Sequence, residues 1–445
     1  MEKYLTSPYC CGVLKDYVDV NPPTDCSKLS DNSIVSFVPM TNVQEKTNMV
    51  TYDDVPYEKV KKGFTVFKKG DMIWAKITPC MQNGKSCIVD QMPTEIGFGS
   101  TEFHVIRKKD ERLYMPYLWA ILSNDNVLKA AQAVFNGSAG QQRVSSSFIE
   151  RFPAVIPDYN TQIKMVSKLE TKLNVLHENR RKANELLLSL PKNLISELDI
   201  SFADINTSVS YSTKLSDILN RIDADFYSPK FVHFRKQIEE GKYPSAYIGD
   251  ITERIVTGFA AGKQNQADDL PDEERVPQLR PFSITPEGEL SFETKKYVPK
   301  KNVKNNDYCQ KNEVIFNNTN SPDLVGKTTV FDSDVLCTAS NHMTRITVKD
   351  GVNPYYVSYF FNLLLSIGYW KLLCTNFNNQ AGVNIETLKS VKIPLPDIET
   401  QNAIVAKIMG RRSEANRLRK EAEQEWKTAK EQFEKELLGE SFRSN

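Results

Sequence analysis

Two segments of the chain end in a Gly-Lys pair of the kind that closes a phosphate-binding loop. The first pair is Gly84-Lys85, and the second is Gly326-Lys327, which ends the stretch NTNSPDLVGK. A nucleotide-binding loop of the pattern G-x-x-x-x-G-K-[ST] needs a further glycine, because its backbone N–H groups must surround the phosphates. Pro79 and Ser321 occupy that place here. The pattern therefore favours a hairpin turn followed by a strand over nucleotide binding.

Two further segments come close to catalytic patterns of DNA-modifying enzymes. An adenine methyltransferase carries N-P-P-[FY], whose aromatic ring stacks on a flipped base. The NPPT at 21–24 ends in Thr24, which cannot stack. A nuclease set can be assembled from Asp158, Glu170 and Lys172, but the last two fall within a helical stripe. We interpret both matches as accidental, and keep a stand-alone DNA-modifying enzyme, either an adenine methyltransferase or a nuclease, as the alternative function.

Composition narrows the class of protein. The 445 residues carry a net charge of +1, so any nucleic-acid contact must come from local basic patches rather than bulk charge. Eight cysteines without a C-x-x-C pair, and only four histidines, suggest neither a zinc site nor disulfides. No apolar run is long enough for a bilayer, and the N-terminus does not read as a signal peptide. We expect a cytoplasmic protein with no membrane segment, no metal and no cofactor of its own.

The chain contains one plan twice. VIPDYNTQIKMVSKL at 155–169 matches PLPDIETQNAIVAKI at 394–408 without a gap, at a shift of 239 residues. GDMIWAKITPCMQNGKSCIVD at 70–90 matches NEVIFNNTNSPDLVGKTTVFD at 312–332 at a shift of 242, which aligns the two Gly-Lys pairs. Such self-similarity at a nearly fixed displacement predicts a tandem of two units, each about 200 residues long.

Each unit ends in a long amphipathic stretch. At about 1.5 Å per residue, a helix of about forty residues reaches about 60 Å and outruns a small domain, so much of its apolar stripe needs another helix. We predict that the second helix runs back along the first as an antiparallel coiled coil, with Pro191 interrupting the first helix near its end. The apolar stripes are Ile163, Val166, Leu169, Leu173, Leu176, Ala183, Leu187, Leu190, Leu194 and Leu198, and Ile404, Ile408, Ala415, Leu418, Ala422, Trp426, Ala429, Phe433 and Leu437.

The globular parts read as mixtures of strands and helices. Short β-branched runs separated by Gly, Asn and Pro predict strands at 70–77, 85–90 and 103–108, and again at 313–318, 327–332 and 344–349. Segments 114–131 and 352–373 read as helices entered near a proline. The aromatic residues crowded at 355–361 favour a core over a base-stacking platform.

The predicted fold class is therefore α+β, with two mixed α/β domains in pseudo-twofold tandem joined by two long, antiparallel helices. The predicted boundaries are 1–157 for the first domain, 158–200 for the first long helix, 201–244 for a connecting segment, 245–396 for the second domain and 397–440 for the second long helix.

Several motifs together resemble those of the DNA-specificity (S) subunit of type I restriction-modification systems. They include GDMIWAKITPCMQNGK, GFGSTEFHVIR, VPQLRPFSITPEGEL, RIDADFYSPKF and LKSVKIPLPDIETQNAIVAKI, in the order of that family and over nearly the whole chain. The resemblance implies a protein without catalytic activity whose two target-recognition domains each read one half of a split double-stranded DNA target. One departure lies in the first copy, which has FVPM where the second has the more family-like LRP, so a basic contact at Arg280 has no counterpart at Pro39.

The resemblance also implies partners. The paired helices would set the spacing of the half-sites and dock two methyltransferase subunits, which would hold the methyl donor S-adenosylmethionine, and restriction and translocase subunits would complete the complex. Elementary geometry agrees, because two unlike domains held tens of Å apart would meet DNA grooves roughly one turn or more apart, since B-DNA advances about 3.4 Å per base pair.

The loop between the paired strands of each domain is the best candidate for reading DNA. Asn and Gln suit adenine edges, Lys suits guanine or phosphate, and small residues let the backbone approach phosphate. Asn, Thr and Pro also form turns in most proteins, so a purely structural loop stays open as the alternative. The candidate DNA-binding residues are Lys76, Thr78, Gln82, Asn83, Lys85, Ser100, Thr101, Gln141, Gln142 and Arg143 in the first copy, and Lys263, Arg280, Asn317, Asn318, Thr319, Asn320, Lys327, Ser340, Asn341, His342, Asn379 and Gln380 in the second.

Overall fold

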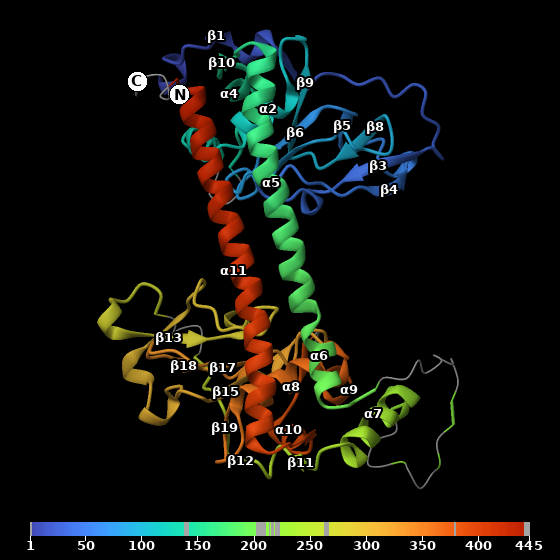
Figure 1. Ribbon diagram of the computed structural model, residues 1–445, viewed down its shortest axis with the longest axis vertical. Coiled ribbons are helices and arrows are strands. Elements are labelled where there is room, and N and C mark those ends of the chain that lie inside the picture. Colours follow the sequence, from blue (N-terminus) through green and yellow to red (C-terminus); the bar gives the residue numbers. More distant parts are fainter. Residues whose placement is uncertain are drawn as a thin grey trace. The chain divides into compact units, whose positions relative to one another are not determined.

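The computed structural model divides into two compact units (Figure 1). Unit 1 comprises Met1–Arg181 with Leu418–Asn445, and unit 2 comprises Lys182–Arg417. The structure describes residues 2–137, 142–201, 211–212, 214, 218, 223–261, 267–377 and 380–439. Each unit therefore combines one globular domain with a part of each long helix.

In unit 1 the first domain is built on two four-stranded sheets. One has the order β2-β9-β6-β7, and the other has the order β4-β3-β8-β5, in which β3 and β8 pair in parallel. Strands β1 and β10 form a separate antiparallel pair. The elements are α1 (Glu2–Leu5), β1 (Cys10–Val13), β2 (Val18–Val20), β3 (Ile34–Val38), β4 (Asp53–Pro56), β5 (Thr65–Lys68), β6 (Met72–Ala75), β7 (Ser86–Ile88), β8 (Ile96–Gly99), β9 (Phe103–Lys108), α2 (Met115–Leu122), α3 (Asp125–Gln132), α4 (Ser146–Glu150) and β10 (Pro153–Val155).

The second domain, in unit 2, repeats this plan. Its main sheet has the order β12-β19-β15-β17, its parallel pair is β13 with β18, and its closing antiparallel pair is β11 with β22. The elements are α6 (Leu190–Glu197), α7 (Pro229–Glu240), β11 (Ser245–Tyr247), β12 (Thr252–Thr257), β13 (Arg275–Leu279), β14 (Tyr297–Pro299), β15 (Val314–Asn317), β16 (Thr319–Asn320), β17 (Thr328–Val330), β18 (Thr338–Ala339), β19 (Met343–Val348), α8 (Pro354–Ser366), α9 (Tyr369–Leu373), β20 (Thr375–Phe377), β21 (Gln380–Gly382), α10 (Ile385–Lys389) and β22 (Lys392–Pro394). The tandem repeat and its predicted strands are confirmed, whereas each predicted helix, 114–131 and 352–373, is divided into two, α2 with α3 and α8 with α9.

The central strand of each main sheet is apolar on both faces because it lies between two cores. Met72 and Trp74 of β6 belong to one buried cluster, and Ile73 and Ala75 to another. Alternate side chains of a strand point to opposite faces, so a strand covered on both sides reads as a continuous apolar run. Strand β15 follows the same rule. Tyr356, Tyr359, Phe360 and Phe361 of α8 are buried, as predicted for core residues, whereas Tyr355 is only partly buried.

Each long helix begins with the same set of polar contacts. Helix α5 (Tyr159–Leu188) and helix α11 (Ile398–Leu437) start after Asp158 and Asp397. These carboxylates accept the backbone N–H of Thr161 at 3.0 Å and of Thr400 at 2.9 Å, which satisfies a helix N-terminal donor. Helix α5 ends at Leu188 and α6 follows with Pro191 in its first turn, so the predicted interruption is confirmed.

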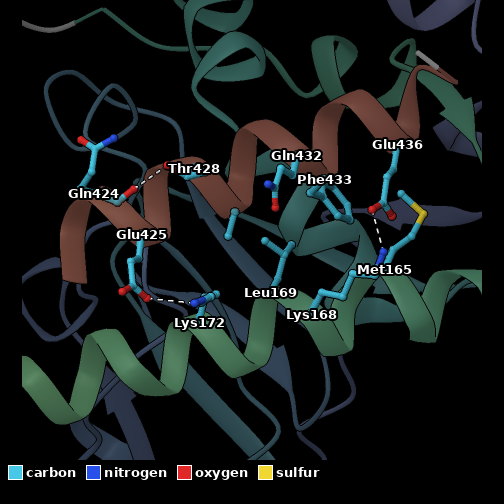
Figure 2. Close-up of a pocket in the computed structure, with 11 residues that line it drawn as sticks. Met165, Lys168, Leu169, Lys172, Gln424, Glu425, Thr428, Gln432, Phe433 and Glu436 are labelled. Atoms are coloured by element: carbon cyan, nitrogen blue, oxygen red, sulfur yellow. Dashed lines mark hydrogen bonds and ion pairs between the residues drawn. The ribbon is translucent and has the colours of Figure 1, made fainter. Parts of the chain in front are cut away.

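Within unit 1, α5 and the end of α11 lie side by side and antiparallel (Figure 2). Ion pairs join Lys168 to Glu436 at 2.7 Å and Lys172 to Glu425 at 3.0 Å, so residue numbers rise along one helix as they fall along the other. Met165, Leu169 and Phe433 supply apolar contact between them. Exposed ion pairs contribute little, so this apolar stripe stabilises the pairing. Ile163, predicted to lie in the stripe, is 39% exposed, because Met165 and Val166 occupy the buried face.

Within unit 2, the start of α11 pairs with α6 in the same antiparallel sense. Lys407 bonds both carboxylate oxygens of Glu197, at 2.8 and 2.9 Å. Ile404, Val405 and Ile408 share a buried cluster with Leu190 and Leu194. The predicted antiparallel helix pairing is thus found in each unit taken by itself.

Each domain also packs against a helix that the other repeat contributes. In unit 1, Trp426 of α11 stacks on Trp119 with ring centroids 6.4 Å apart, and the Tyr4 hydroxyl donates to Glu434 at 2.7 Å. In unit 2, the residues of α6 join the core formed by α8. The two repeats therefore depend on each other for burial of their apolar helix faces. None of the described helices is long and apolar enough to cross a membrane.

Candidate nucleic-acid interface

In the first domain, three of the predicted segments meet at one edge of the main sheet. The backbone N–H of Lys76, after β6, donates to the Glu102 carbonyl at 2.9 Å, which brings in the turn between β8 and β9. The backbone N–H of Thr78 donates to the Gln142 carbonyl at 3.0 Å. The loop 76–85, the turn 100–102 and the segment 142–143 thus form one surface, as backbone groups need partners in irregular segments.

The second domain assembles its counterparts in the same way. The backbone N–H of Asn318 donates to the His342 carbonyl at 3.0 Å, which matches the bond between Lys76 and Glu102. Thr319 and Asn320 of β16 pair with Gly382 and Ala381 of β21. The loop 317–327, the turn 340–342 and the strand 380–382 therefore occupy equivalent places, although their side chains differ.

The Gly-Lys pair has a structural role in both domains. The Lys327 ammonium donates to the carbonyls of Pro281 at 3.1 Å and Ile284 at 2.7 Å, and Lys85 donates to the Met40 carbonyl at 3.0 Å. The carbonyls of Met40 and Pro281 belong to the 3-10 turns Met40–Asn42 and Pro281–Ser283, which follow β3 and β13, and Ile284 comes directly after the second turn. Lys327 is 9% exposed, and burial lowers the pKa of its ammonium. The lysine tethers the reading loop to a neighbouring turn.

The conformation of the two glycines explains why Gly precedes Lys in both copies. Gly84 and Gly326 have φ of 72° and 98°, a region that other residues rarely adopt. A Cβ on Gly326 would lie 2.2 Å from Trp370 Cδ1, so the turn also packs closely. The expected hairpin turn is confirmed, and no nucleotide loop is present at these residues.

Two predicted contact residues are buried inside the second domain. Asn317 is fully buried and its amide donates to the Leu324 carbonyl at 3.1 Å. The Asn318 amide donates to the Asn341 carbonyl at 3.2 Å and to Thr344 Oγ1 at 2.9 Å. These side chains shape the loop from within, because β15 extends through Asn317. The side chains of Asn317, Asn318 and Lys327 therefore bond to the domain itself, and their contact with DNA stays a prediction.

The surface of the first domain carries a neutralised arginine. The Arg143 guanidinium donates to both Glu102 oxygens, at 2.9 and 2.8 Å, and this bond lowers the pKa of the Glu102 carboxyl. Asn83 is exposed but its amide donates to Glu45 at 2.8 Å. Other side chains predicted to contact DNA lie at the surface, namely Lys76, Thr78, Gln82, Ser100, Thr101 and Gln142.

Both domains have a pocket beside these segments. That of the first domain, about 340 Å³, is lined by Lys76 and by residues of the NPPT motif. That of the second domain, about 560 Å³, is lined by Gln278, Arg280, Phe282, Leu324, Ser340 and His342, with Asn320 and Asn341 beside them. Phe282 is 46% exposed and Leu324 is 45% exposed. Sequence reasoning missed both apolar residues, because exposure of a single Phe or Leu leaves no periodic signal. The exposed Gln380 lies on β21, whereas Gln141, Lys263 and Asn379 lie outside the described residues.

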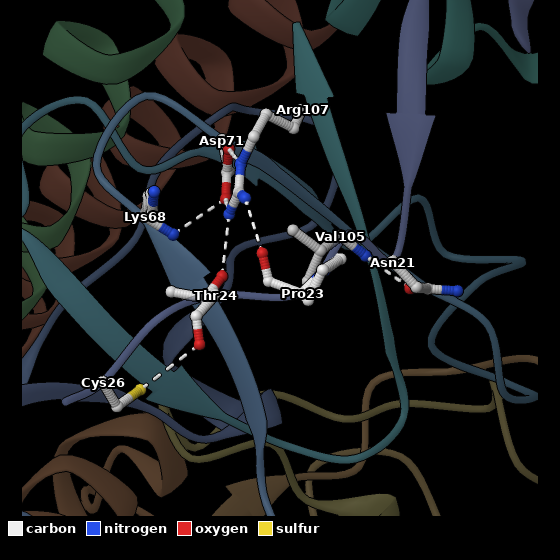
Figure 3. A network of polar contacts seen from close by, with 8 residues as sticks. All are labelled: Asn21, Pro23, Thr24, Cys26, Lys68, Asp71, Val105 and Arg107. Carbon is white, nitrogen blue, oxygen red and sulfur yellow. Dashed lines mark hydrogen bonds and ion pairs between the residues drawn. The ribbon is translucent and has the colours of Figure 1, made fainter.

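The motif NPPT is an extended segment held against β9 rather than a catalytic loop (Figure 3). Asn21 accepts the Val105 N–H through its side-chain oxygen at 3.0 Å. Arg107 donates to the Pro23 carbonyl at 3.1 Å and to Thr24 Oγ1 at 2.9 Å, while its fork holds both oxygens of Asp71. These hydrogen bonds of the motif thus hold its chain in place.

The nuclease-like set does not assemble either. Asp158 caps the start of α5, where it accepts the Thr161 hydroxyl at 2.5 Å. Glu170 and Lys172 lie further along the same helix at exposed positions, and Lys172 pairs with Glu425. The three side chains therefore belong to a helix cap and a helix pair.

Comparison with known proteins places the chain in a family. A profile described as "Type I restriction modification DNA specificity domain" matches residues 15–187 and 236–425. The EcoEI type I restriction enzyme specificity subunit of Escherichia coli is 28% identical over 225 residues, which are 50% of this chain and 37% of the relative. The EcoAI specificity subunit of the same species is 30% identical over 220 residues, 49% of this chain and 37% of the relative. The matches thus span under two thirds of the length of these relatives.

Among solved structures, the HsdS subunit from Thermoanaerobacter tengcongensis covers 98% of this chain and 97% of its own, at 15% identity and a TM-score of 0.36. A structure described as part of a type I R-M system covers 93% of this chain and 92% of its own, at 15% identity and a TM-score of 0.47. Both scores are too low to support a conclusion by themselves. The two profile matches cover well over half of the residues and coincide with the two repeats, so the chain belongs to the type I restriction modification DNA specificity domain family.

Proposed function

We propose that the chain recognises a bipartite sequence in double-stranded DNA, one half with each domain, and performs no chemistry itself. The observation that supports this most is a surface built twice from the same three backbone segments but furnished with unlike side chains. Backbone contacts to DNA position a protein and carry no sequence information, whereas side chains at base edges specify. Two identical frames with different side chains suit two different half-sites on one duplex.

We further propose that the chain is the assembly scaffold of a multi-subunit enzyme. Membership in the family supports partners that carry the chemistry, namely two methyltransferase subunits with bound S-adenosylmethionine and the restriction and translocase subunits. The near-neutral charge of +1 adds that the chain alone binds DNA weakly and gains affinity from its partners. A protein of this kind works where the chromosome lies, in the cytoplasm.

A selection experiment tests the recognition. The full chain with its methyltransferase subunit is incubated with duplex DNA that carries two randomised blocks and spacers of varied length, and the bound fraction is sequenced. We expect two enriched blocks at one spacer length, with the spacer sequence unread. Enrichment of a single block, or tight binding without sequence preference by the chain alone, would contradict the proposal.

The alternative, a stand-alone modifying enzyme, has a direct test. The purified chain is incubated with DNA and a labelled methyl donor, and separately with supercoiled DNA and Mg²⁺. We expect neither methyl transfer nor cleavage, and we expect methyl transfer to appear when the methyltransferase subunit is added. Transfer by the chain alone would favour the alternative.

A further inference from the structure

The pocket of the second domain contains buried polar atoms that lack a partner. Arg280, at the end of β13, has a buried Nε that makes no hydrogen bond to any residue the structure describes. Ser340 is 5% exposed, and its Oγ is likewise without a partner among those residues. Both residues line the pocket. Buried polar groups are paired in nearly all proteins, so a ligand that supplies the missing partners is expected here.

The Arg280 guanidinium forms no ion pair with the nearby carboxylate of Asp268. Asp268 bonds Lys296 at 2.7 Å, and this ion pair is the main reason that the pKa of the Asp268 carboxyl is lowered. The charge of Arg280 makes only the smallest contribution to that lowering. The planar fork of the arginine is thus available for a bidentate acceptor.

The walls of the pocket discriminate between a base edge and a phosphate. Phe282 and Leu324 are apolar and half exposed at this surface, while Arg280 and His342 can form hydrogen bonds. A base edge combines both requirements, because guanine offers O6 and N7 to an arginine fork and thymine offers a methyl group to an apolar side chain. A phosphate offers oxygens alone and gains nothing from exposed apolar neighbours.

Comparison of the two domains also favours a base edge over a phosphate as the ligand. The turn after β3 in the first domain matches the turn after β13, since Lys85 and Lys327 donate to the equivalent carbonyls of Met40 and Pro281. Pro39 stands there in place of Arg280. Both domains meet the same phosphate backbone, so a phosphate contact should recur in both copies. A contact found in one copy is expected to depend on sequence.

The reading segments of the two copies also differ in their hydroxyl groups. In the first domain Ser100 Oγ accepts the backbone N–H of Glu102 at 3.2 Å, whereas Thr78 Oγ1 is buried without a partner among the described residues. In the second domain Ser340 Oγ, the counterpart of Ser100 Oγ, is the buried hydroxyl that lacks such a partner. The two equivalent frames therefore use different side chains for the same backbone groups.

We propose that Arg280 reads a guanine in the half-site of the second domain, and that Phe282 covers the methyl group of a thymine next to that guanine. This inference rests on the proposed function, and it assigns to one residue the strongest base preference of that half-site. Leu324 lines the same pocket and adds to its apolar surface.

The experiment uses the full complex and the selected target. Arg280→Gln removes the charge and Arg280→Lys keeps it but loses the fork, so both should lower the preference for guanine at one position by about ten- to a hundredfold. The other half-site should be unchanged. Lys389→Gln, on an exposed helix of the same domain, serves as the matched control. If Arg280→Lys kept the preference, and Arg280→Gln weakened all sequences evenly, the residue would be a phosphate contact and the inference would be overturned.

Modified DNA tests the wild-type protein without any risk of misfolding. Replacing that guanine with 7-deazaguanine removes N7 and should weaken wild-type binding about tenfold but leave Arg280→Gln unaffected. Replacing the adjacent thymine with uracil removes the methyl group and should weaken the wild type a few-fold but not Phe282→Ala. Equal losses in wild type and variants would contradict the assignment.

The outcomes separate this inference from the proposed function. If the wild-type complex selects no sequence, the proposed function fails and the inference falls with it. If the wild type selects two blocks but every variant of Arg280 selects the same two, only the inference fails. Thermal melting of each variant shows that it is folded before its preference is compared.

Discussion

The two domains share a frame and differ in the side chains that it presents. Gln162 and Gln401 are both fully buried and bond the same kinds of backbone group, and Lys85 and Lys327 tether the same turn. At the surface, however, the first domain presents Arg143 locked to Glu102, whereas the second presents a pocket around Arg280. Residues that repeat therefore build the domain, and residues that do not repeat are the candidates for specificity.

In a tandem of two recognition domains, comparison of the copies thus separates residues that build the domain from candidates for specificity. The two domains also differ below the surface, where the buried His104 of the first corresponds to the buried Thr344 of the second. Even below the surface, the hydrogen bonds that support the reading segments are re-made with different chemistry in each copy. Matched pairs of variants, one in each domain, test whether equivalent residues have equivalent roles.

The largest effect is expected at the matched glutamines. Gln401 accepts the Asn353 N–H at 2.8 Å and donates to the Pro396 carbonyl at 2.7 Å, and Gln162 makes the corresponding bonds to Tyr114 and Pro157. Gln162→Leu and Gln401→Leu should each lower the free energy of unfolding by about 3 kcal/mol, because buried backbone groups lose their partners. Urea denaturation of both variants, with the exposed Gln424→Leu as control, measures this. Clearly unequal losses would show that the two frames are not equivalent.

A smaller loss of stability, unequal between the two domains, is expected for variants of Lys85 and Lys327. Lys327→Met leaves two carbonyls unpaired, of which that of Ile284 is buried, while Lys85→Met leaves only the partly buried carbonyl of Met40 unpaired. The free energy of unfolding should fall by about 2 kcal/mol for the first and about 1 kcal/mol for the second. If nucleotide binding were the role of these lysines, stability would be unchanged and a nucleotide would stabilise only the wild type in thermal melting.

The domains should differ in their response to acid. Burial lowers the pKa of His104, whose ring nitrogens lie 3.1 Å from the Asn21 amide and 2.9 Å from the Val144 carbonyl. Above a pH of about 6.5 the imidazole is neutral in folded and unfolded chains and has no effect. As pH falls below that value the unfolded chain binds the proton more readily, so the first domain loses stability down to the lowered pKa of the folded state.

Hydrogen exchange followed by mass spectrometry resolves this domain by domain. Peptides of the first domain should lose protection between pH 7 and 5 more than peptides of the second. His104→Thr, which introduces the residue found in the second domain, should abolish the difference. An equal pH response in both domains of the wild type would contradict the assignment.

The smallest effect is expected at the Glu102 and Arg143 pair. The arginine is 43% exposed, and exposed ion pairs contribute at most about 1 kcal/mol, so Glu102→Gln should change stability little. The Arg143 charge is then no longer balanced by the Glu102 carboxylate, so the salt dependence of DNA binding should steepen by about one charge. Titrations at several salt concentrations measure the slope. An unchanged slope would place Arg143 away from DNA.

Much of the frame could be predicted from the sequence. The strands around the Gly-Lys pairs and the helices after Pro157 and Pro396 were visible because the same positions recur at nearly one displacement, and because chain reversal needs glycine at a positive φ. These signals are local. A strand, a turn or a cap is specified by residues within a few positions of it, so one sequence is enough to find them.

The polar contacts of the site could not be predicted in the same way. Lys327 meets the carbonyl of Ile284, and Arg143 meets Glu102, over separations of 43 and 41 residues. Such pairings depend on how the second sheet of each domain lies on the main sheet, which no local pattern reveals. The burial of Asn317 could not be predicted for a similar reason, since it looks like a loop residue but is the buried last residue of β15.

Exchange of the first domain tests the central claim most directly. Residues 1–155 are replaced by the corresponding domain of another family member, with Tyr4, Trp119 and Asn126 retained because they contact α11. The methylated adenines in the genome of a host that expresses the complete complex are then mapped. We predict a bipartite motif in which one half-site changes and the other stays as in the wild type. A motif changed in both halves, or in neither, would contradict the account.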